Sequence, residues 1–443
     1  MTHPIDQLAH SAVFGDGSAK VEARKEIHLR ARKSGAVSSS IYPMYMAIAR
    51  GEVRAFTTPA FNIRALTYDS CRALFRAAMR NKVGAFIFEI ARSEIGYTEQ
   101  RPSEYSACVL AAALREGFRG PVFIQGDHFQ ASAKKWATKD GRAAEMKALE
   151  SLIDEAIAAE FYNIDIDTST LVDLSFPTRE EQQRANYEGT AHLTNFIRRR
   201  QPKGITISVG GEIGEVGKYN TQPDEVRAYM NGLNRLLGGQ TGISKISVQT
   251  GTSHGGVPLA DGTIAQAKID FNVLREVTEI GRREYGIAGS VQHGASTLPE
   301  SVFNKFPESK AVEIHLATGF QNMILDAPSF PEDMKREIRD FCFANAADER
   351  KPGETDEQFV YKSRKKSLGP FKRRMWEMPD SAKQPIIAEL EAKFEFLMQK
   401  LGVHDTVSIV GKLVPISTAG LPEYAAASEE LTASATVDPN EGE

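Results

Sequence analysis

Cysteine is scarce in this sequence. Among 443 residues only Cys71, Cys108 and Cys342 occur, and no two of them form a Cys-x-x-Cys pair. Such a pattern supplies neither a disulfide framework nor a zinc–thiolate site. A reducing, cytoplasmic location is the expectation that fits it.

The chain also lacks a strong excess of charge and a long apolar run. Its formal net charge is −4, whereas a general nucleic-acid binder is usually basic, so we expect no nucleic-acid partner. No apolar run is long enough to span a bilayer, so we expect no membrane partner. The first twenty residues have no apolar core and do not read as a signal peptide.

Short apolar runs rich in β-forming residues recur through the centre of the chain, and each is followed by a helical pattern. The runs cover residues 55–63, 84–91, 121–127, 162–169, 205–212, 245–251, 288–294 and 312–318. Alternating strands and helices predict a parallel sheet, and eight such units predict a (β/α)8 TIM barrel. The alternative is an open doubly wound sheet, which usually carries a Gly-rich phosphate turn after its first strand. "PAFNIRALT" is not such a turn.

The regions outside this repeat differ in composition, and they suggest four parts. We expect an N-terminal helical arm over residues 1–50, with a polar helix ending near Gly35, and the barrel over 51–326. A charged C-terminal helical extension over 327–425 and an acidic, disordered tail over 426–443 would follow. The extension contains the basic run "KSRKKSLGPFKRRMW", either a solvated helix face or an anion-binding edge.

Polar residues gather where the expected strands end. They are Asn62, Glu89, Asp127, His128, Asp165, Asp167, Glu212, His254, His293, His315 and Thr318. Four of the nine histidines are among them, and in a barrel these ends meet at the face that carries the chemistry. Neutral imidazoles and a carboxylate around an open position bind zinc or another divalent ion. The pattern therefore predicts a catalytic metal site.

Small residues follow two of these histidines. Gly255 comes after His254, and Gly294, Ala295 and Ser296 come after His293. Backbone N–H groups and a serine hydroxyl in the last loops of a barrel suit a phosphate, although glycines in tight turns give the same pattern. We find no lysine at a strand end that would form a Schiff base, which favours metal chemistry. Consecutive strand residues point to opposite faces, so we expect Asp127 and His128 to share a site only where their strand gives way to a loop.

Together these motifs resemble the class II, metal-dependent fructose-bisphosphate aldolase family, which includes the tagatose-bisphosphate aldolases. The resemblance runs in order over residues 55–325, through "PAFNI", "GDHF", "IDIDTS", "GGEIGEVG", "GTSHGG" and "QHGAS". It implies a homo-oligomer, either dimer or tetramer, that acts on a sugar phosphate.

The resemblance also implies roles for individual residues. His128, His254 and His293 would hold the divalent metal, usually Zn2+, with Glu212 as an alternative or second-site ligand and Asp167 as a second-site carboxylate. Asp127 would be the proton-donating acid, and Glu215 is the only close candidate for the base. The residues matching contacts to the substrate, its phosphate and a monovalent cation are Asn62, Gly255, Gly294, Ser296 and Thr318. His315 and Gly319 stand where the family usually has asparagine and aspartate.

Three functions fit this pattern. The first is an aldolase that cleaves a ketose (bis)phosphate to dihydroxyacetone phosphate and an aldehyde through a metal-stabilised enediolate. The second is a metal-dependent sugar or sugar-acid epimerase or isomerase, which His315 and Gly319 favour. The third is a non-catalytic barrel that assists a true aldolase, and the intact set of His128, His254 and His293 argues against it.

Overall fold

The computed structural model describes residues 3–213, 219–251, 269–414 and 416. Its centre is a closed barrel of eight parallel strands, as the alternation of strands and helices predicts. In chain order the strands are β2 (Thr58–Asn62), β3 (Ile87–Ala91), β4 (Gly120–Gln130), β5 (Asn163–Asp167), β6 (Ser208–Glu212), β7 (Lys245–Val248), β8 (Ser290–Gln292) and β9 (Glu313–Leu316). Each pairs with its neighbour in sequence, and β9 closes the barrel by pairing with β2.

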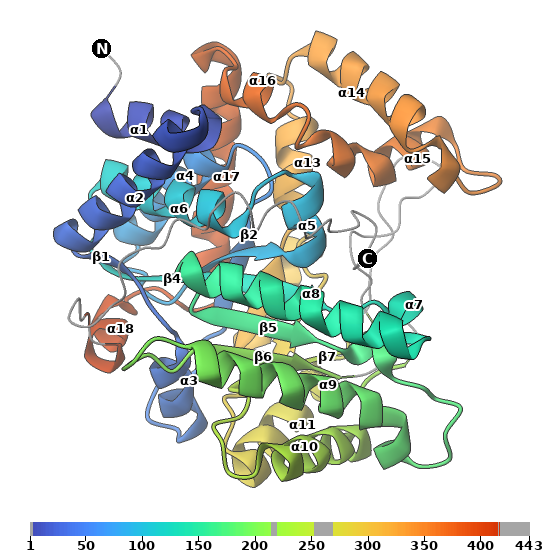
Figure 1. Ribbon diagram of the computed structural model, residues 1–443. Helices are drawn as coiled ribbons and strands as arrows, with labels where there is room; N and C mark the ends of the chain where they lie inside the picture. Colours follow the sequence, from blue (N-terminus) through green and yellow to red (C-terminus); the bar gives the residue numbers. More distant parts are fainter. Residues whose placement is uncertain (1–2, 214–218, 252–268, 415, 417–443) are drawn as a thin grey trace.

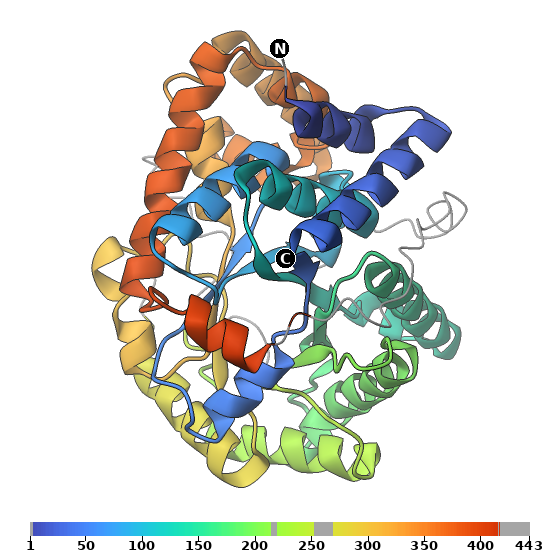
Figure 2. The same ribbon diagram turned by 90° about the vertical axis from the view of Figure 1, so that its left-hand side faces the viewer.

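Helices surround the barrel, so its strands are buried on both faces (Figures 1 and 2). They follow the strands as α4 (Thr67–Arg80), α5 (Arg92–Tyr97), α6 (Pro102–Glu116), α7 (Ala133–Trp136), α8 (Lys139–Ala158), α9 (Arg179–Arg200), α10 (Pro223–Leu237), α11 (Phe271–Ile280), α12 (Lys305–Glu308) and α13 (Thr318–Leu325). At least one of these helices follows each of the eight strands, as the sequence pattern predicts.

The N-terminal segment adds α1 (Pro4–Phe14), α2 (Gly17–Ser34), β1 (Ala36–Ser38) and α3 (Tyr42–Ala49). Helix α2 ends as expected at Gly35, whose φ of 90° is the left-handed conformation that glycine adopts readily. Strand β1 then pairs with the first residues of β4, which places it at the end of the barrel where the strands begin. The sequence pattern does not reveal β1, because three residues are too short to show a period.

The C-terminal segment forms α14 (Glu332–Asn345), α15 (Asp356–Ser363), α16 (Lys372–Trp376), α17 (Asp380–Lys400) and α18 (Val407–Leu413). Helix α17 packs along α4 (Figure 1), whereas α18 lies beside α3 across the end of the barrel where the strands begin (Figure 2). Thr406 Oγ1 accepts hydrogen bonds there from the backbone of Gly84 and Ala85. One end of the barrel is therefore covered, and the chemistry is left to the other.

The basic run of the extension is mostly paired with acidic side chains. Arg364 bonds Asp326, Lys366 bonds Glu349 and Arg374 bonds Glu337. These pairs lie on the surface and screen much of the run's charge. Among the described residues, no helix combines the length and the apolar character needed to cross a membrane.

Candidate metal centre and active site

A β-bulge in β4 brings Asp127 and His128 to the same cavity. The pairing of β4 with β5 shifts register between Gly126 and Phe129, and His128 has a φ of 38°, in the left-handed region. The strand then continues to Gln130. The expectation that the strand gives way to a loop at this pair is therefore wrong. The extra residue of a bulge turns one side chain to the other face of the strand, which has the same effect.

His128 is surrounded by carboxylates. Its Nδ1 lies 2.9 Å from Asp167 Oδ2 at the end of β5 and 3.1 Å from Glu212 Oε2 at the end of β6. Burial alone would lower the pKa of His128, but the charges of Asp127 and Glu212 outweigh it and raise the pKa well above 6.5. Burial, together with the charge of Asp167, raises the pKa of Glu212 to about 7.

Asp167 is held by donors on both oxygens. Besides His128, the side chain of Gln130 donates to Oδ2, and the backbone N–H and hydroxyl of Ser169 donate to Oδ1 at 3.0 and 2.7 Å. Burial favours the neutral form, yet these hydrogen bonds lower the pKa of Asp167 below 3.8. Such a carboxylate suits the role of orienting His128 better than that of a direct metal ligand.

His293, directly after β8, completes a group of candidate metal ligands. One ligand atom each from His128, Glu212 and His293 lie within 4.8 Å of one another, and all three residues are buried. The His293 ring lies between the two other imidazoles, with centroids 4.2 Å from His128 and 4.1 Å from His315. Its Nε2 shares a hydrogen bond of 2.8 Å with Ser247 Oγ on β7.

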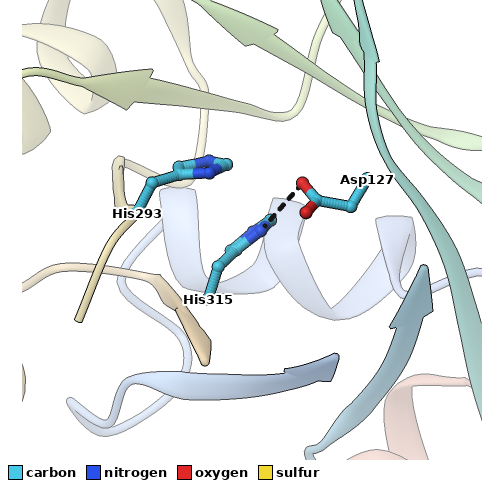
Figure 3. A group of neighbouring side chains, drawn as sticks. All are labelled: Asp127, His293 and His315. Atoms are coloured by element: carbon cyan, nitrogen blue, oxygen red, sulfur yellow. Dashed lines mark hydrogen bonds and ion pairs between the residues drawn. The ribbon is translucent and has the colours of Figure 1, made fainter. Parts of the chain in front are cut away.

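His315 and Asp127 both line the cavity, and the ring of one faces the carboxylate of the other (Figure 3). His315 Nδ1 lies 3.1 Å from Asp127 Oδ1 and 3.1 Å from Glu89 Oε2, while Nε2 lies 2.6 Å from Glu313 Oε1. Because both ring nitrogens face carboxylates, both act as donors. Burial would lower the pKa of His315, but the charges of Glu89 and Asp127 raise it well above 6.5.

A second, fully buried group of charges lies beneath this wall. Lys245 Nζ, at the start of β7, donates to Gln125 Oε1 at 2.8 Å, to Asp165 Oδ2 at 2.9 Å and to Glu313 Oε1. Burial disfavours the ionised form of both Asp165 and Glu313. At Glu313 the charge of Lys245 outweighs burial, and the pKa falls to about 2. Burial dominates at Asp165, whose pKa rises to about 6.

A cavity opens at this end of the barrel. Eight residues that the sequence predicts for the site line it: Asn62, Asp127, His128, His293, Gly294, Ser296, His315 and Thr318. Glu212 and Asp167 lie directly behind it, in contact with His128. Of the remaining predicted site residues, Glu215, His254 and Gly255 lie outside the described residues, so their predicted roles stay predictions.

The strand-end pattern does not reveal every functional side chain. Arg64 lines the cavity and pairs with Glu94, and its Nη1 lies 3.3 Å from Thr318 Oγ1. Arg64 lies two residues past the end of β2. From the sequence alone, an arginine there cannot be distinguished from one on the surface. Lys245 begins its strand instead of ending it, so only the folded barrel brings it to the ion network.

The chain belongs to the class II fructose-bisphosphate aldolase family, whose sequence model matches residues 44–390. None of the curated proteins matches the sequence.

Solved structures are similar in fold. A probable tagatose 6 phosphate kinase from Sinorhizobium meliloti 1021 has 16% identity and a TM-score of 0.54, with 81% of this chain and 99% of that chain covered. A fructuronate-tagaturonate epimerase from Cohnella laeviribosi, complexed with glycerol, has 12% identity and a TM-score of 0.52, with 79% of this chain and 82% of that chain covered. At such identities these likenesses speak for the barrel fold and not for a reaction.

Proposed function

We propose that the protein is a metal-dependent aldolase that cleaves a ketose phosphate to dihydroxyacetone phosphate and an aldehyde. Its membership of the class II family supports an aldolase-like scaffold. The observation that carries the proposal is the group of His128, Glu212 and His293 at the mouth of the barrel, with Asp127 Oδ1 only 4.0 Å from His128 Nε2.

The donor set fits a divalent metal. Two imidazoles and one carboxylate are the ligands of catalytic zinc sites, and zinc lies 2.0–2.2 Å from such atoms in general. Atoms within 4.8 Å of one another need to move by less than about 1 Å to meet that geometry. His254 would supply the third imidazole. A bound divalent ion would act as a Lewis acid that stabilises the negative charge of an enediolate.

Asp127 is placed to move the proton of the reaction. It lines the cavity beside the donor group and is 4% exposed, so water does not compete strongly for its carboxylate. Retro-aldol cleavage requires a group that takes the hydroxyl proton in one direction and returns it in the other. Glu215 is our candidate for the separate base that exchanges the proton on carbon.

The phosphate would lie on the opposite side of the cavity. Gly294 and Ser296 follow β8, and Thr318 opens α13, so backbone N–H groups and two hydroxyls converge there. Arg64 Nη1, 3.3 Å from Thr318 Oγ1, adds a positive charge at this edge. We propose that these groups bind the anionic end of the substrate and that Asn62, whose buried Oδ1 has no hydrogen-bond partner among the described residues, receives a substrate hydroxyl.

His315 favours a second candidate, a metal-dependent epimerase or isomerase. Its ring puts a second proton-carrying group on the cavity wall, in contact with Asp127. Epimerisation at a carbon next to a carbonyl requires removal and return of a proton on an enediolate, and His315 adds a proton-carrying group for that step. This reaction would use the same cavity without breaking a carbon–carbon bond.

One experiment tests both proposals. Bound metal is measured by mass spectrometry on the purified protein, and ketose mono- and bisphosphates are then screened for aldehyde release. Hydrogen exchange next to the carbonyl is followed by NMR with the same sugars and with sugar acids. We expect stoichiometric metal and aldehyde release. Exchange without cleavage would favour the epimerase, and a protein without stoichiometric metal would contradict both.

A further inference from the structure

Glu313 is a fully buried carboxylate that four side chains hold in place. Lys245 Nζ, Gln125 Nε2 and His315 Nε2 all donate to its Oε1, those of Gln125 and His315 at 2.9 and 2.6 Å. Tyr45 OH donates to Oε2. The carboxylate therefore has donors on both oxygens and one fixed orientation.

Lys245 supplies the charge that makes this arrangement tolerable inside the barrel. It is 1% exposed, and the ammonium also bonds Asp165, so two carboxylates share one buried cation. Gly210 on β6 provides the space for these two side chains, because a Cβ there would lie 2.3 Å from Asp165 Oδ1 and 3.0 Å from Lys245 Cε. A buried ion pair of this kind specifies geometry more than it adds stability.

The His315 ring connects this fixed anion to the cavity. Its Nε2 bonds Glu313, and its Nδ1 lies 3.1 Å from Asp127 Oδ1. Turning the ring would break both contacts at once. A carboxylate that orients an imidazole, which in turn orients a reacting group, is a recurring way to hold catalytic side chains in place.

We propose that Glu313 is a positioning residue: through His315 it holds the Asp127 carboxylate in the orientation that proton transfer requires. The inference rests on the proposed role of Asp127 as the proton carrier. Glu313 does not line the cavity, so it acts without touching substrate.

The test is Glu313→Gln, which keeps the volume and removes the charge. For any substrate that the wild-type protein turns over, we expect kcat to fall by about 100-fold, the loss typical of a misplaced catalytic group, with KM within about threefold. Metal content by mass spectrometry should stay unchanged. A crystal structure of the variant should show His315 Nδ1 more than about 3.5 Å from Asp127, beyond hydrogen-bond distance.

Two further variants separate positioning from stability. Glu160→Gln alters a buried glutamate that pairs with Arg32 and His28 away from the cavity, so it should destabilise the protein and leave kcat unchanged. Tyr45→Phe removes one donor to Glu313 and keeps its charge, so it serves if Glu313→Gln does not fold, with an expected kcat loss of about two- to tenfold.

The proposal is overturned if Glu313→Gln keeps the wild-type kcat, or if Glu160→Gln lowers kcat equally. If the wild-type protein turns over no substrate, the proposed function fails. The crystal structures of the wild type and of Glu313→Gln then test the positioning role of Glu313 without an activity assay. A His315 ring that keeps its place beside Asp127 in Glu313→Gln would show that Glu313 does not position it.

Discussion

Two of the three buried clusters of candidate metal ligands among the described residues differ in composition, and the third, Asp127 with His293 and His315, shares one histidine with each of them. His128, Glu212 and His293 offer ligand atoms within 4.8 Å of one another, and so do Asp165, Glu313 and His315. The second cluster contains Lys245 Nζ, bonded to both of its carboxylates. In the first cluster, Glu212 instead contacts the His128 ring, which also bonds Asp167.

The difference appears in the acidity of two buried glutamates. The pKa of Glu212 is raised to about 7, whereas that of Glu313 is lowered to about 2. Burial disfavours both charges, but only Glu313 has an ammonium beside it. The cluster around Lys245 has its own cation, whereas the other would gain one from solution, which is why we propose His128, Glu212 and His293 as the metal site.

The largest expected effect comes from removing the internal cation. Lys245→Met keeps the length of the side chain and leaves Asp165 and Glu313 without their positive partner. Breaking a buried pair in this way costs about 3–5 kcal/mol. The free energy of unfolding in urea should fall by that amount, while Lys310→Met, which breaks an exposed pair with Glu279, should cost less than about 1 kcal/mol. Equal losses would contradict the comparison.

Removal of a ligand from the other cluster should act on metal binding instead. His293→Ala takes away one of about four ligands, and a full zinc site contributes about 10–16 kcal/mol, so the affinity should fall by about 100- to 1000-fold. Calorimetric titration with Zn2+ measures this. His192→Ala, an exposed histidine paired with Glu150, is the matched control and should bind like the wild type. Unchanged affinity in His293→Ala would remove it from the site.

The raised pKa of Glu212 also predicts how the stability of the metal-free protein depends on pH. With the metal chelated, unfolded chains ionise Glu212 from pH 4.5 upward, while the folded protein holds the proton up to about pH 7. The folded state is therefore destabilised as the pH rises, by about 2 kcal/mol between pH 4.5 and 6.5. Urea unfolding at both pH values should show this fall in the wild type and a smaller one in Glu212→Gln. An equal fall in the free energy of unfolding in both proteins would mean that Glu212 is already ionised in the metal-free folded state.

The rim of the barrel could be predicted from sequence because each strand end is visible locally, as an apolar run that stops at a polar residue. His293 and Glu212 are found in this way. The interior network could not be, because only Asp165 belongs to the strand-end pattern. Lys245 and Glu313 begin their strands, and they meet Asp165 only across the closed barrel. The β4 bulge also escapes prediction, because Asp127 and His128 give the same pattern whether the strand ends or bulges there.

The smallest effect expected concerns Asp167, which contacts the first cluster without an assigned place among its ligands. Because it fixes His128 through Nδ1 and is itself held by Ser169 and Gln130, Asp167→Asn should weaken zinc binding by about 10- to 100-fold, as for other residues that orient a ligand. Calorimetry checks this, with Asp154→Asn, a surface aspartate paired with Arg200, as the control. A loss as large as that of His293→Ala would instead make Asp167 a direct ligand of the same metal, and not the second-site carboxylate that the sequence resemblance implies.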